Sequence, residues 1–318
     1  MKKIKIGIIG SSGYTASELL RLIANHPKLA LDFAYSHSHA GKSFADLYSD
    51  LEWMYPGYRF SGEINKGVDV VFLCLGHGEA ALFLKQHRFA DHTLVIDLSQ
   101  DHRLDHSDFV YGLSEINRHE IAKAQKIANP GCFATAIELA LYPFVAELPA
   151  EVHITALTGS TGAGVRPSDT SHFSWRQNNI SVYKAFSHQH LHEISALLAY
   201  QSWQGRLNFI PMRGCFARGI LASIYFYSDL SFEAARSLLS DFYKDGSFVH
   251  IREREPDLKS VINTNHCQLS LQKHGDYLHI VSVIDNLIKG ASGQALQNLN
   301  LMMGWPEDLG LTLKPIAY

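Results

Sequence analysis

Short apolar runs and amphipathic segments alternate along the first 145 residues of the chain. The runs VDVVFLCLG and TLVIDLS are apolar throughout, which is typical of strands buried on both faces of a sheet. KIKIGIIG and LALDFAYS are further strand-length runs. Between them, TASELLRLIANH and GEAALFLKQHRF have helical spacing, and the first places Ala16, Leu19, Leu20 and Ile23 on one face. Strands that alternate with helices predict a doubly wound parallel sheet of the α/β class.

A different pattern begins near Pro149. The strands EVHITALTGS, GILASIYFYS and YLHIVSVID are longer, and apolar and polar residues alternate along them. LHEISALLAY and SFEAARSLLSDFY read as helices between these strands. The second half therefore predicts an α+β domain with a mixed or antiparallel sheet. The final helical segment, GASGQALQNLNLMMG, fits either domain by its periodicity.

Length and charge limit the class of partner. A chain of 318 residues exceeds one ordinary hydrophobic core, so we expect two domains. The formal net charge is −3 and no cluster of Lys and Arg stands out, which argues against nucleic acid and membrane surfaces as partners. No apolar run approaches the about 20 residues that span a bilayer, and Gly7 and Gly10 interrupt the apolar start. We expect a cytoplasmic protein with a small-molecule substrate.

Four cysteines are spread along the chain without CxxC spacing, so neither disulfides nor a metal site is expected. One of them, Cys132, follows Pro-Gly in ANPGCFATAIELALYPF, where Ile137, Leu141 and Phe144 begin a helical period. The spacing predicts a helix that starts near Cys132 and buries one face. Unpaired backbone N–H groups and the helix dipole stabilise a thiolate in the first helical turn. A small buried hydrophobic side chain is the alternative interpretation of this cysteine.

The first predicted strand runs into a glycine turn and then a helix. Gly7, Gly10 and Gly13 form a variant of the G-x-G-x-x-G pattern, whose backbone amides bind the pyrophosphate of a dinucleotide in Rossmann-type domains. A packing turn is the alternative. NAD-binding domains usually end the second strand with an acidic residue, whereas here Ser36 to Lys42 offer hydroxyls and a cation. This difference favours NADP(H).

A thiolate beside a nicotinamide suits the interconversion of an aldehyde and an activated acyl group, because a thiohemiacetal can lose hydride and become a thioester. Such chemistry needs an acid/base, for which imidazole is well matched near neutral pH. The segment AFSHQHLHEI supplies His188, His190 and His192 directly before a helix. A metal site is the competing interpretation, but no other Cys or His completes it at a recognisable spacing.

Several segments together resemble one enzyme family. ANPGCFATAIELALYP resembles the active-site signature of N-acetyl-γ-glutamyl-phosphate reductases, NADP-dependent enzymes of arginine biosynthesis. GIIGSSGYTASELLRLIANHP, VIDLSQDHRL, YGLSEINR, TGSTGAG, RGILASIY and VIDNLIKGASGQALQNLNLMMG are similar to further segments of that family, in the same order. Aspartate-semialdehyde dehydrogenases share the chemistry, but Ser-Gly-Tyr-Thr with Gly-Gln-Ala-x-Gln-Asn fits the arginine-pathway enzymes better.

The resemblance implies an NADPH-dependent reduction of N-acyl-γ-glutamyl phosphate to the N-acyl-glutamate 5-semialdehyde and phosphate. Cys132 would form the thioester and His190 or His188 would be the acid/base, with His190 preferred because it directly precedes the helix. The resemblance implies cofactor-binding residues at Gly10, Ser11, Ser12, Gly13, Tyr14, Thr15, Ser36, Gly162 and Asn286. We expect substrate-binding residues at Arg103, Asn129 and Arg218.

The family's architecture implies an NADP-binding domain of residues 1–131 and 290–318 and a catalytic, substrate-binding and oligomerisation domain of residues 132–289. It also implies a homo-oligomer, a dimer or a tetramer.

Two segments depart from the family pattern. The usual His-Arg-His-x-Pro-Glu-Ile appears as HQHLHEI, and Val165 stands where an arginine commonly follows Ala-Gly. Both segments could contact the acyl group, so an N-succinyl substrate stays open beside N-acetyl. Three other functions also stay open: an aspartate-semialdehyde dehydrogenase-like reductase, a Cys-His hydrolase or acyltransferase, which has no need of the glycine turn, and a catalytically silent nucleotide-binding regulator.

Overall fold

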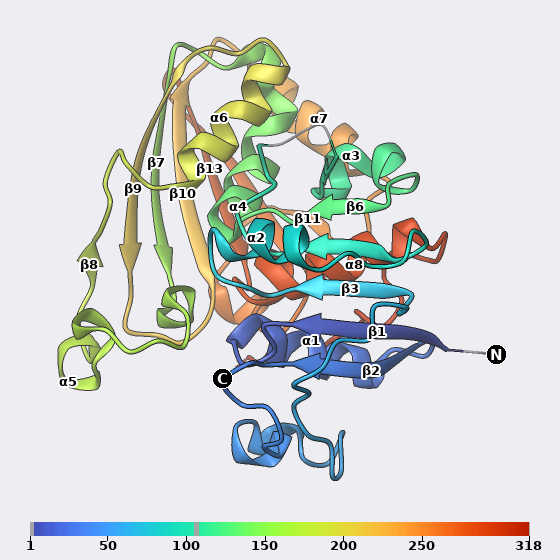
Figure 1. Ribbon diagram of the computed structural model, residues 1–318. Helices are drawn as coiled ribbons and strands as arrows, with labels where there is room; N and C mark the ends of the chain where they lie inside the picture. The colour runs from blue at the N-terminus through green and yellow to red at the C-terminus, as the bar shows by residue number, and fades with distance from the viewer. Residues whose placement is uncertain (1–2, 105–107, 318) are drawn as a thin grey trace. The chain divides into compact units, whose positions relative to one another are not determined.

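The computed structural model describes residues 3–104 and 108–317. The chain separates into two compact units (Figure 1): one comprises the residues up to Pro130 with Ala291–Thr312, the other Gly131–Gly290 with the segment from Leu313 onward. The sequence predicts the segment from Leu313 onward to be part of the first domain. It groups with the second unit, where the backbone N–H of Ile316 donates to the carbonyl of Ile262, 3.1 Å away.

The first unit contains a six-stranded sheet in the order β2-β1-β3-β4-β6-β5, and every neighbouring pair is parallel. Its strands are β1 (Ile4–Ile9), β2 (Leu29–Tyr35), β3 (Val70–Leu73), β4 (Leu94–Asp97), β5 (Val110–Tyr111) and β6 (Lys126–Ala128). Its helices are α1 (Tyr14–Asn25), α2 (Glu79–Gln86), α3 (Ser114–Ile121) and α8 (Gly293–Met302), with 3₁₀ turns at Phe44–Asp46 and Ser49–Leu51. Figure 1 shows β1, β2 and β3 side by side.

The hydrophobic pattern explains this unit. β3 is buried at each of its four residues, as predicted for a strand covered on both faces. In α1 the four apolar residues that were predicted to share one face of the helix are buried, and so is Leu22. The predicted fold class of this half is confirmed.

Helix α8 is buried over Gly293–Leu301, amide side chains included. Asn298 Nδ2 donates to the Gly112 carbonyl at 2.8 Å and to Asn129 Oδ1 at 3.1 Å. Asn300 Nδ2 donates to two further carbonyls, at Glu307 and Leu309. Buried amides are stable only when they are paired in this way, so α8 is fixed to the first unit by hydrogen bonds as well as by apolar contacts.

The second unit contains a seven-stranded mixed sheet in the order β11-β12-β13-β10-β7-β9-β8. Its strands are β7 (Glu151–Thr158), β8 (Ser181–Val182), β9 (Arg206–Arg213), β10 (Ile220–Tyr227), β11 (Val249–Arg252), β12 (Cys267–His274) and β13 (Tyr277–Ile284). Its helices are α4 (Cys132–Leu141), α5 (Phe173–Arg176), α6 (His190–Tyr200) and α7 (Phe232–Tyr243). The 3₁₀ turns are Tyr142–Glu147, Ser160–Ala163, Asp169–Ser171 and Leu258–Ser260, and a π-helical turn covers Ile288–Ser292.

Pairing of β7 with β9 and of β11 with β12 is parallel, whereas β10 is antiparallel to both β7 and β13, so the predicted mixed sheet is confirmed. Buried and more exposed residues alternate along β7, which places one face of the sheet toward helices. Helix α4 packs against β10, β13 and α6. The prediction that α4 buries a single face is wrong, because every residue of Phe133–Leu141 is buried. Over the described residues, no helix has both the length and the apolar character to cross a bilayer.

Candidate active site

The Cys132 side chain lies at the first residue of α4, as predicted. The N-cap residue is Gly131, no side chain caps the helix, and its first turn has no acidic residue. The thiol is partly exposed. An uncapped helix N-terminus directs backbone N–H groups and a positive partial charge at the thiol, which favours the thiolate.

Gly290 gives the thiol its space. A Cβ placed at Gly290 would lie 2.8 Å from Cys132 Cβ, closer than real Cβ atoms approach a neighbour, and 3.2 Å from Cys132 Cα, which is a tight contact. Gly290 belongs to the π-helical turn after β13, and its N–H donates to the Asp285 carbonyl at 2.9 Å. Such turns are frequent at functional sites. Sequence reasoning did not single out this glycine, because its contact is with a residue 158 positions earlier in the chain.

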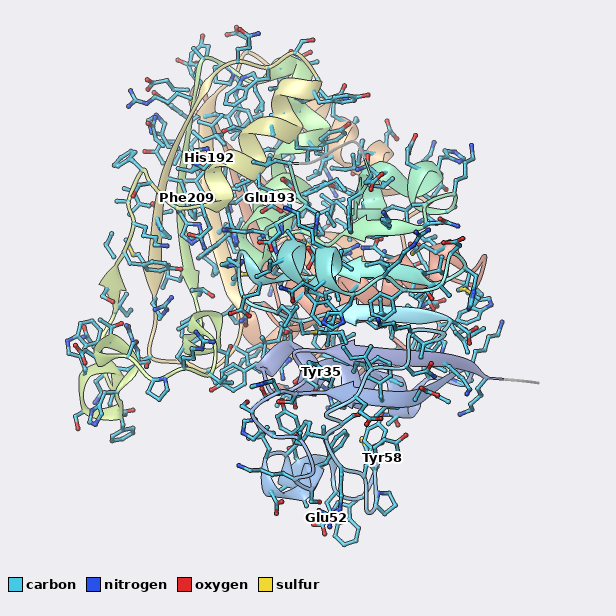
Figure 2. All side chains as sticks on the ribbon, viewed as in Figure 1. Tyr35, Glu52, Tyr58, His192, Glu193 and Phe209 are labelled. Carbon is cyan, nitrogen blue, oxygen red and sulfur yellow. The ribbon has the colours of Figure 1, made fainter. Side chains whose placement is uncertain are left out.

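A buried carboxylate holds the residue before the cysteine. Glu193 on α6 is 4% exposed, and its Oε1 accepts the backbone N–H of Gly131 at 2.8 Å. Glu193 and its neighbour His192 are labelled on α6 in Figure 2. This bond fixes the start of α4 to the start of α6. Sequence reasoning missed Glu193, since an acidic residue in a helical first turn reads as an ordinary dipole partner.

Two of the three candidate histidines are buried beside the residue that follows Cys132. The rings of His188 and His190 lie 5.4 and 6.2 Å from the Phe133 ring and 4.6 Å from each other. His192 is exposed. The structure therefore brings His188 and His190 together near the start of α4 and leaves His192 at the surface.

The two buried histidines differ in what they can do. His188 Nδ1 accepts the backbone N–H of His190 at 3.2 Å, so that nitrogen carries no proton. Burial, with Lys184 and Arg213, lowers the pKa of His188 to about 4. His188 is therefore neutral near pH 7 and is a poor proton donor there. His190 carries the backbone N–H that fixes the tautomer of His188.

The glycine loop after β7 is fixed by Asn286. Its Oδ1 accepts the Gly219 N–H at 2.7 Å and its Nδ2 donates to Thr161 Oγ1 at 3.0 Å. A Cβ at Gly162 would meet Thr158 Oγ1 at 3.2 Å, so the loop lies close to the strand end. Gly162 and Asn286, the two residues of the second unit expected to bind cofactor, thus lie in two loops that are joined by the bond from Asn286 to Thr161, next to Gly162.

The predicted substrate residue Arg218 is engaged by a buried carboxylate. Its Nε and Nη2 donate to Asp285 at 3.1 and 3.3 Å. Asp285 is fully buried and also accepts backbone N–H groups at Asn263, Leu287 and Ile288. The Asp285 carboxylate therefore shapes the turn that leads to Gly290.

In the first unit, the glycine turn after β1 has two different kinds of glycine. A Cβ at Gly7 would collide with the Phe33 ring, so Gly7 serves packing. Gly10 has a φ of +77°, and a Cβ there would lie 2.6 Å from the Cys74 carbonyl oxygen. The backbone N–H groups of Gly10 and Ser11, and the Ser11 hydroxyl, all donate to the Tyr35 carbonyl, which braces the turn against β2.

The N-terminus of α1 fits a pyrophosphate. Its N-cap is Gly13, no side chain caps it, and no acidic residue lies in its first turn. Ser12, Tyr14 and Thr15 flank this end, and Tyr14 is exposed. Free amides, a positive dipole end and the absence of an acid are what a bound phosphate requires.

Ser36, at the end of β2, is buried and lies beside His39, with Oγ and Nδ1 3.4 Å apart. The exposed Arg59 donates through Nη1 to the Gly41 carbonyl at 2.8 Å. This places a guanidinium next to the Ser36 to Lys42 segment. Sequence reasoning missed Arg59, which lies 17 residues beyond Lys42.

The other two predicted substrate residues are buried in hydrogen bonds of the first unit. Arg103 Nε donates to the Asn129 carbonyl at 2.9 Å and Arg103 Nη2 to the Leu98 carbonyl at 3.1 Å. Asn129 Nδ2 donates to the Ala291 carbonyl at 3.1 Å. Both residues therefore fix the chain segments that join this unit to the rest of the sequence.

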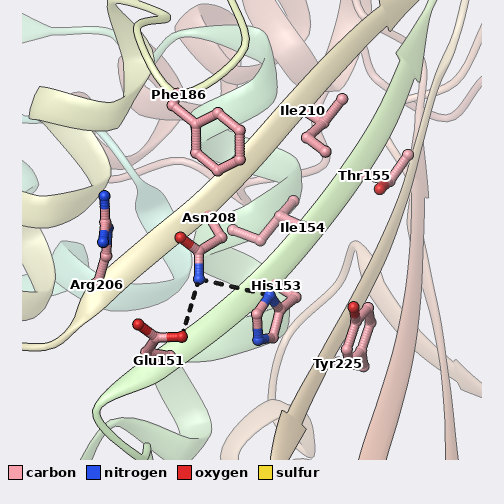
Figure 3. Close-up of a pocket in the computed structure, with 9 residues that line it drawn as sticks. All are labelled: Glu151, His153, Ile154, Thr155, Phe186, Arg206, Asn208, Ile210 and Tyr225. Carbon is pink, nitrogen blue, oxygen red and sulfur yellow. Dashed lines mark hydrogen bonds between the residues drawn. The ribbon is translucent and has the colours of Figure 1, made fainter.

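The outer face of the second unit's sheet contains a shallow pocket (Figure 3). Figure 3 shows Asn208 of β9 with its side-chain amide directed at Glu151 and His153 of β7. Asn208 Nδ2 lies 3.4 Å from Glu151 Oε2 and 3.4 Å from His153 Nδ1. Neither Cys132 nor the buried histidines line it. Within the described ranges, no three side chains of the metal-ligating types come together.

Comparison with known proteins agrees with this arrangement. Residues 5–124 match the family model described as semialdehyde dehydrogenase, NAD binding domain, and residues 132–286 match semialdehyde dehydrogenase, dimerisation domain. N-acetyl-γ-glutamyl-phosphate reductases from Azobacteroides pseudotrichonymphae and Flavobacterium johnsoniae are 51% and 52% identical to the chain. In each case the match covers 99% of this chain and 100% of the relative.

The chain belongs to the N-acetyl-γ-glutamyl-phosphate reductase family. Aspartate semialdehyde dehydrogenase II from Vibrio cholerae has the same fold, with a TM-score of 0.74 and 16% identity over 96% of this chain and 99% of that one. The predicted family and the predicted enzyme class, an oxidoreductase, are confirmed. The expected nicotinamide cofactor, NADP(H), agrees with the matched NAD binding domain, and the matched dimerisation domain supports an oligomer.

Proposed function

We propose that this protein catalyses the NADPH-dependent reduction of an N-acyl-γ-glutamyl phosphate to the N-acyl-glutamate 5-semialdehyde and phosphate, as a step of arginine biosynthesis. The observation that carries the proposal is the Cys132 thiol at the uncapped N-terminus of α4, with space left by Gly290 and with two buried imidazoles packed against the next residue, Phe133. The names of the curated relatives support the substrate class.

The second unit supplies the covalent chemistry. Cys132 Sγ attacks the acyl carbon of the substrate, the C–O bond to phosphate breaks, and orthophosphate leaves as the thioester forms. When bound, NADPH supplies the hydride that reduces this thioester. His190 protonates the oxygen of the resulting thiohemiacetal and takes the proton back when the C–S bond breaks and the aldehyde leaves. We assign this role to His190 because His188 is neutral near pH 7.

The first unit supplies the cofactor site. The amides at the α1 N-terminus, from Gly13 to Thr15, would hold the pyrophosphate, and the positive φ of Gly10 allows the turn that exposes them. Ser36, Lys42 and Arg59 would bind the 2′-phosphate that distinguishes NADP from NAD. The ratio of kcat/KM for NADPH and NADH tests this assignment. We expect a higher kcat/KM with NADPH than with NADH in the intact protein and a smaller preference in Arg59→Ala; equal kcat/KM values for the two cofactors in the intact protein would overturn the assignment.

The acyl group is tested by substrate comparison. We expect the protein to oxidise NADPH with N-acetyl-γ-glutamyl phosphate, and N-succinyl-γ-glutamyl phosphate is compared under the same conditions. Oxidation of NADPH with neither compound, but with aspartyl phosphate, would favour the aspartate-semialdehyde reductase. Release of phosphate without NADPH consumption would favour a hydrolase. Binding of NADPH without turnover of any of these compounds would leave only the silent regulator.

We propose that the chain forms a homodimer or homotetramer through the outer face of the second unit's sheet. Tyr225, Tyr227 and Tyr277 are 43 to 48% exposed there, on two neighbouring strands of the domain that matches the dimerisation model. Light scattering after size-exclusion chromatography gives the mass. Tyr225→Arg should shift it toward the monomer; a monomeric intact protein would contradict the proposal. The cytoplasmic location stays a prediction.

A further inference from the structure

Arg213 lies at the end of β9 and has a buried donor without an acceptor. In register it pairs with Thr158 of β7 and with Ser181 of β8. Its guanidinium carbon lies 4.5 Å from the centroid of the Tyr183 ring. Among the described residues, no hydrogen-bond acceptor reaches its buried Nε. Buried polar groups are normally paired, so an unpaired guanidinium N–H indicates a missing anion.

The surroundings of Arg213 are positive. Lys184 Nζ donates to the amide oxygen of Gln189 at 3.0 Å, and Arg176 donates to carbonyl oxygens, including that of Arg213 at 2.7 Å. None of these three cations has a carboxylate within ion-pair distance in the part of the chain that the structure describes. Three cations without an acid attract an anionic ligand.

This positive cluster adjoins the reacting thiol. The Tyr183 ring packs at 5.7 Å against His188, and His188 packs against Phe133, the residue after Cys132. Burial, followed by the charge of Cys132, raises the pKa of Tyr183 to about 12, which is a second sign that Tyr183 lies near the thiol. All of these residues belong to the second unit.

We propose that Arg213, stacked on Tyr183, binds a carboxylate of the substrate and is the residue that selects acidic acyl phosphates. The inference rests on the proposed function. A planar guanidinium binds a carboxylate through two parallel N–H···O bonds, and Tyr183 keeps that plane in place. Arg218, which the sequence predicted to bind substrate, already donates through Nε and Nη2 to the Asp285 carboxylate.

The carboxylate has two possible sources. Every N-acyl-glutamate substrate has an α-carboxylate, and an N-succinyl group adds a second one. The reaction run in reverse separates them: N-acetyl- and N-succinyl-glutamate 5-semialdehyde are oxidised with NADP and inorganic phosphate, and KM is measured for each reactant. Arg213→Ala and Arg213→Lys are compared with Arg206→Ala, which removes an exposed arginine from the other end of the same strand.

Arg213→Ala should raise the KM of the semialdehyde by roughly 10- to 100-fold, the usual effect of losing hydrogen bonds to a charged group, with kcat and the KM of phosphate nearly unchanged. Arg213→Lys should restore part of the affinity, because the charge stays and the fork is lost. Arg206→Ala should match the intact protein. An equal rise in KM with both semialdehydes would show that Arg213 binds the α-carboxylate. A rise in KM with the N-succinyl compound alone would show that Arg213 binds the carboxylate of the acyl group.

Two results would overturn the inference: an unchanged KM of the semialdehyde in both Arg213 variants, or a rise confined to phosphate. If Arg213→Ala does not fold, Arg213→Lys still tests the loss of the two parallel guanidinium hydrogen bonds, through the KM of the semialdehyde. An intact protein that oxidises neither semialdehyde would refute the proposed function instead, so the two failures are distinct.

Discussion

Replacing Gly290 by alanine tests the packing that positions the thiol. The added Cβ would lie 2.8 Å from Cys132 Cβ, whereas ordinary contact begins at 3.4 Å, so the two atoms must separate by about 0.6 Å (3.4 − 2.8). Gly290 is held by the Asp285 carbonyl at 2.9 Å, and the Asp285 side chain is fixed by Arg218 and by backbone N–H groups. The shift therefore falls mainly on Cys132.

Misplacement of a reacting group by about 1 Å typically costs about 10²-fold in rate, so a shift of this size should lower kcat by roughly 10- to 100-fold. Overpacking at a buried position also destabilises, by roughly 1–3 kcal/mol. The assay is NADPH oxidation with the acyl phosphate, together with NADPH binding, which should be nearly unchanged because the proposed cofactor residues at the α1 N-terminus are untouched.

Gly246→Ala is the matched control. A Cβ at Gly246, in the same unit, would meet only the Tyr243 carbonyl oxygen at 3.5 Å, an ordinary contact. This variant should keep the kcat and stability of the intact protein. A Gly290→Ala protein that is folded and keeps kcat within twofold would refute the reasoning that this glycine positions the thiol.

Three further outcomes follow from the second unit. His190→Asn should lower kcat by about 10²–10⁴-fold with NADPH affinity unchanged, whereas the exposed His192→Asn should do little; a larger loss of kcat for His192→Asn would contradict the assignment. Glu193→Ala leaves the buried Gly131 N–H without its acceptor and should lower the free energy of unfolding in urea by about 1–3 kcal/mol. Glu193→Gln keeps an acceptor and should recover most of that stability. Equal losses of stability in the two variants would argue against a stabilising role for this hydrogen bond. In the folded protein the pKa of His188 is lowered to about 4, so the unfolded chain takes up a proton there more readily than the folded one. The free energy of unfolding of the protein should therefore fall as pH drops from about 6.5 to about 4, and it should fall less in His188→Asn. Parallel plots of unfolding free energy against pH for the two proteins would contradict this.

The sequence predicted those features that depend on local pattern. Continuous apolar runs identified β3 and β4, and the spacing of Leu19, Leu20 and Ile23 identified the buried face of α1. The start of α4 at Cys132 followed from Pro-Gly and the helical period after it. In each case the physical cause, burial on one or both faces, leaves a mark within a few residues.

Features that depend on contacts between distant segments were not predictable in this way. Helix α4 is buried all round because β10, β13 and α6 surround it, although its apolar residues alone suggested one face. The amides of α8 look like a solvated surface in the sequence, yet Asn298 pairs with Gly112 and Asn129, more than 160 positions away.

The site shows the same division. The thiol and the histidine cluster were recognised from their residue types and their positions at helix starts. Glu193 and Arg213 were not, because their roles come from one long-range hydrogen bond and from one donor left unpaired at a strand end. Gly7 was read with Gly10 as a phosphate turn, and only the position of the Phe33 ring shows that it serves packing.

The most direct test of the central claim is a search for the acyl-enzyme. The intact protein is mixed with N-acetyl-γ-glutamyl phosphate without NADPH, and its mass is measured before and after NADPH is added. We predict that the mass rises by one acyl group, that digestion places the group on Cys132, and that NADPH removes it, while Cys132→Ser stays unmodified on the same timescale. Turnover without any modification of Cys132, or equal acylation of Cys132→Ser, would contradict the account.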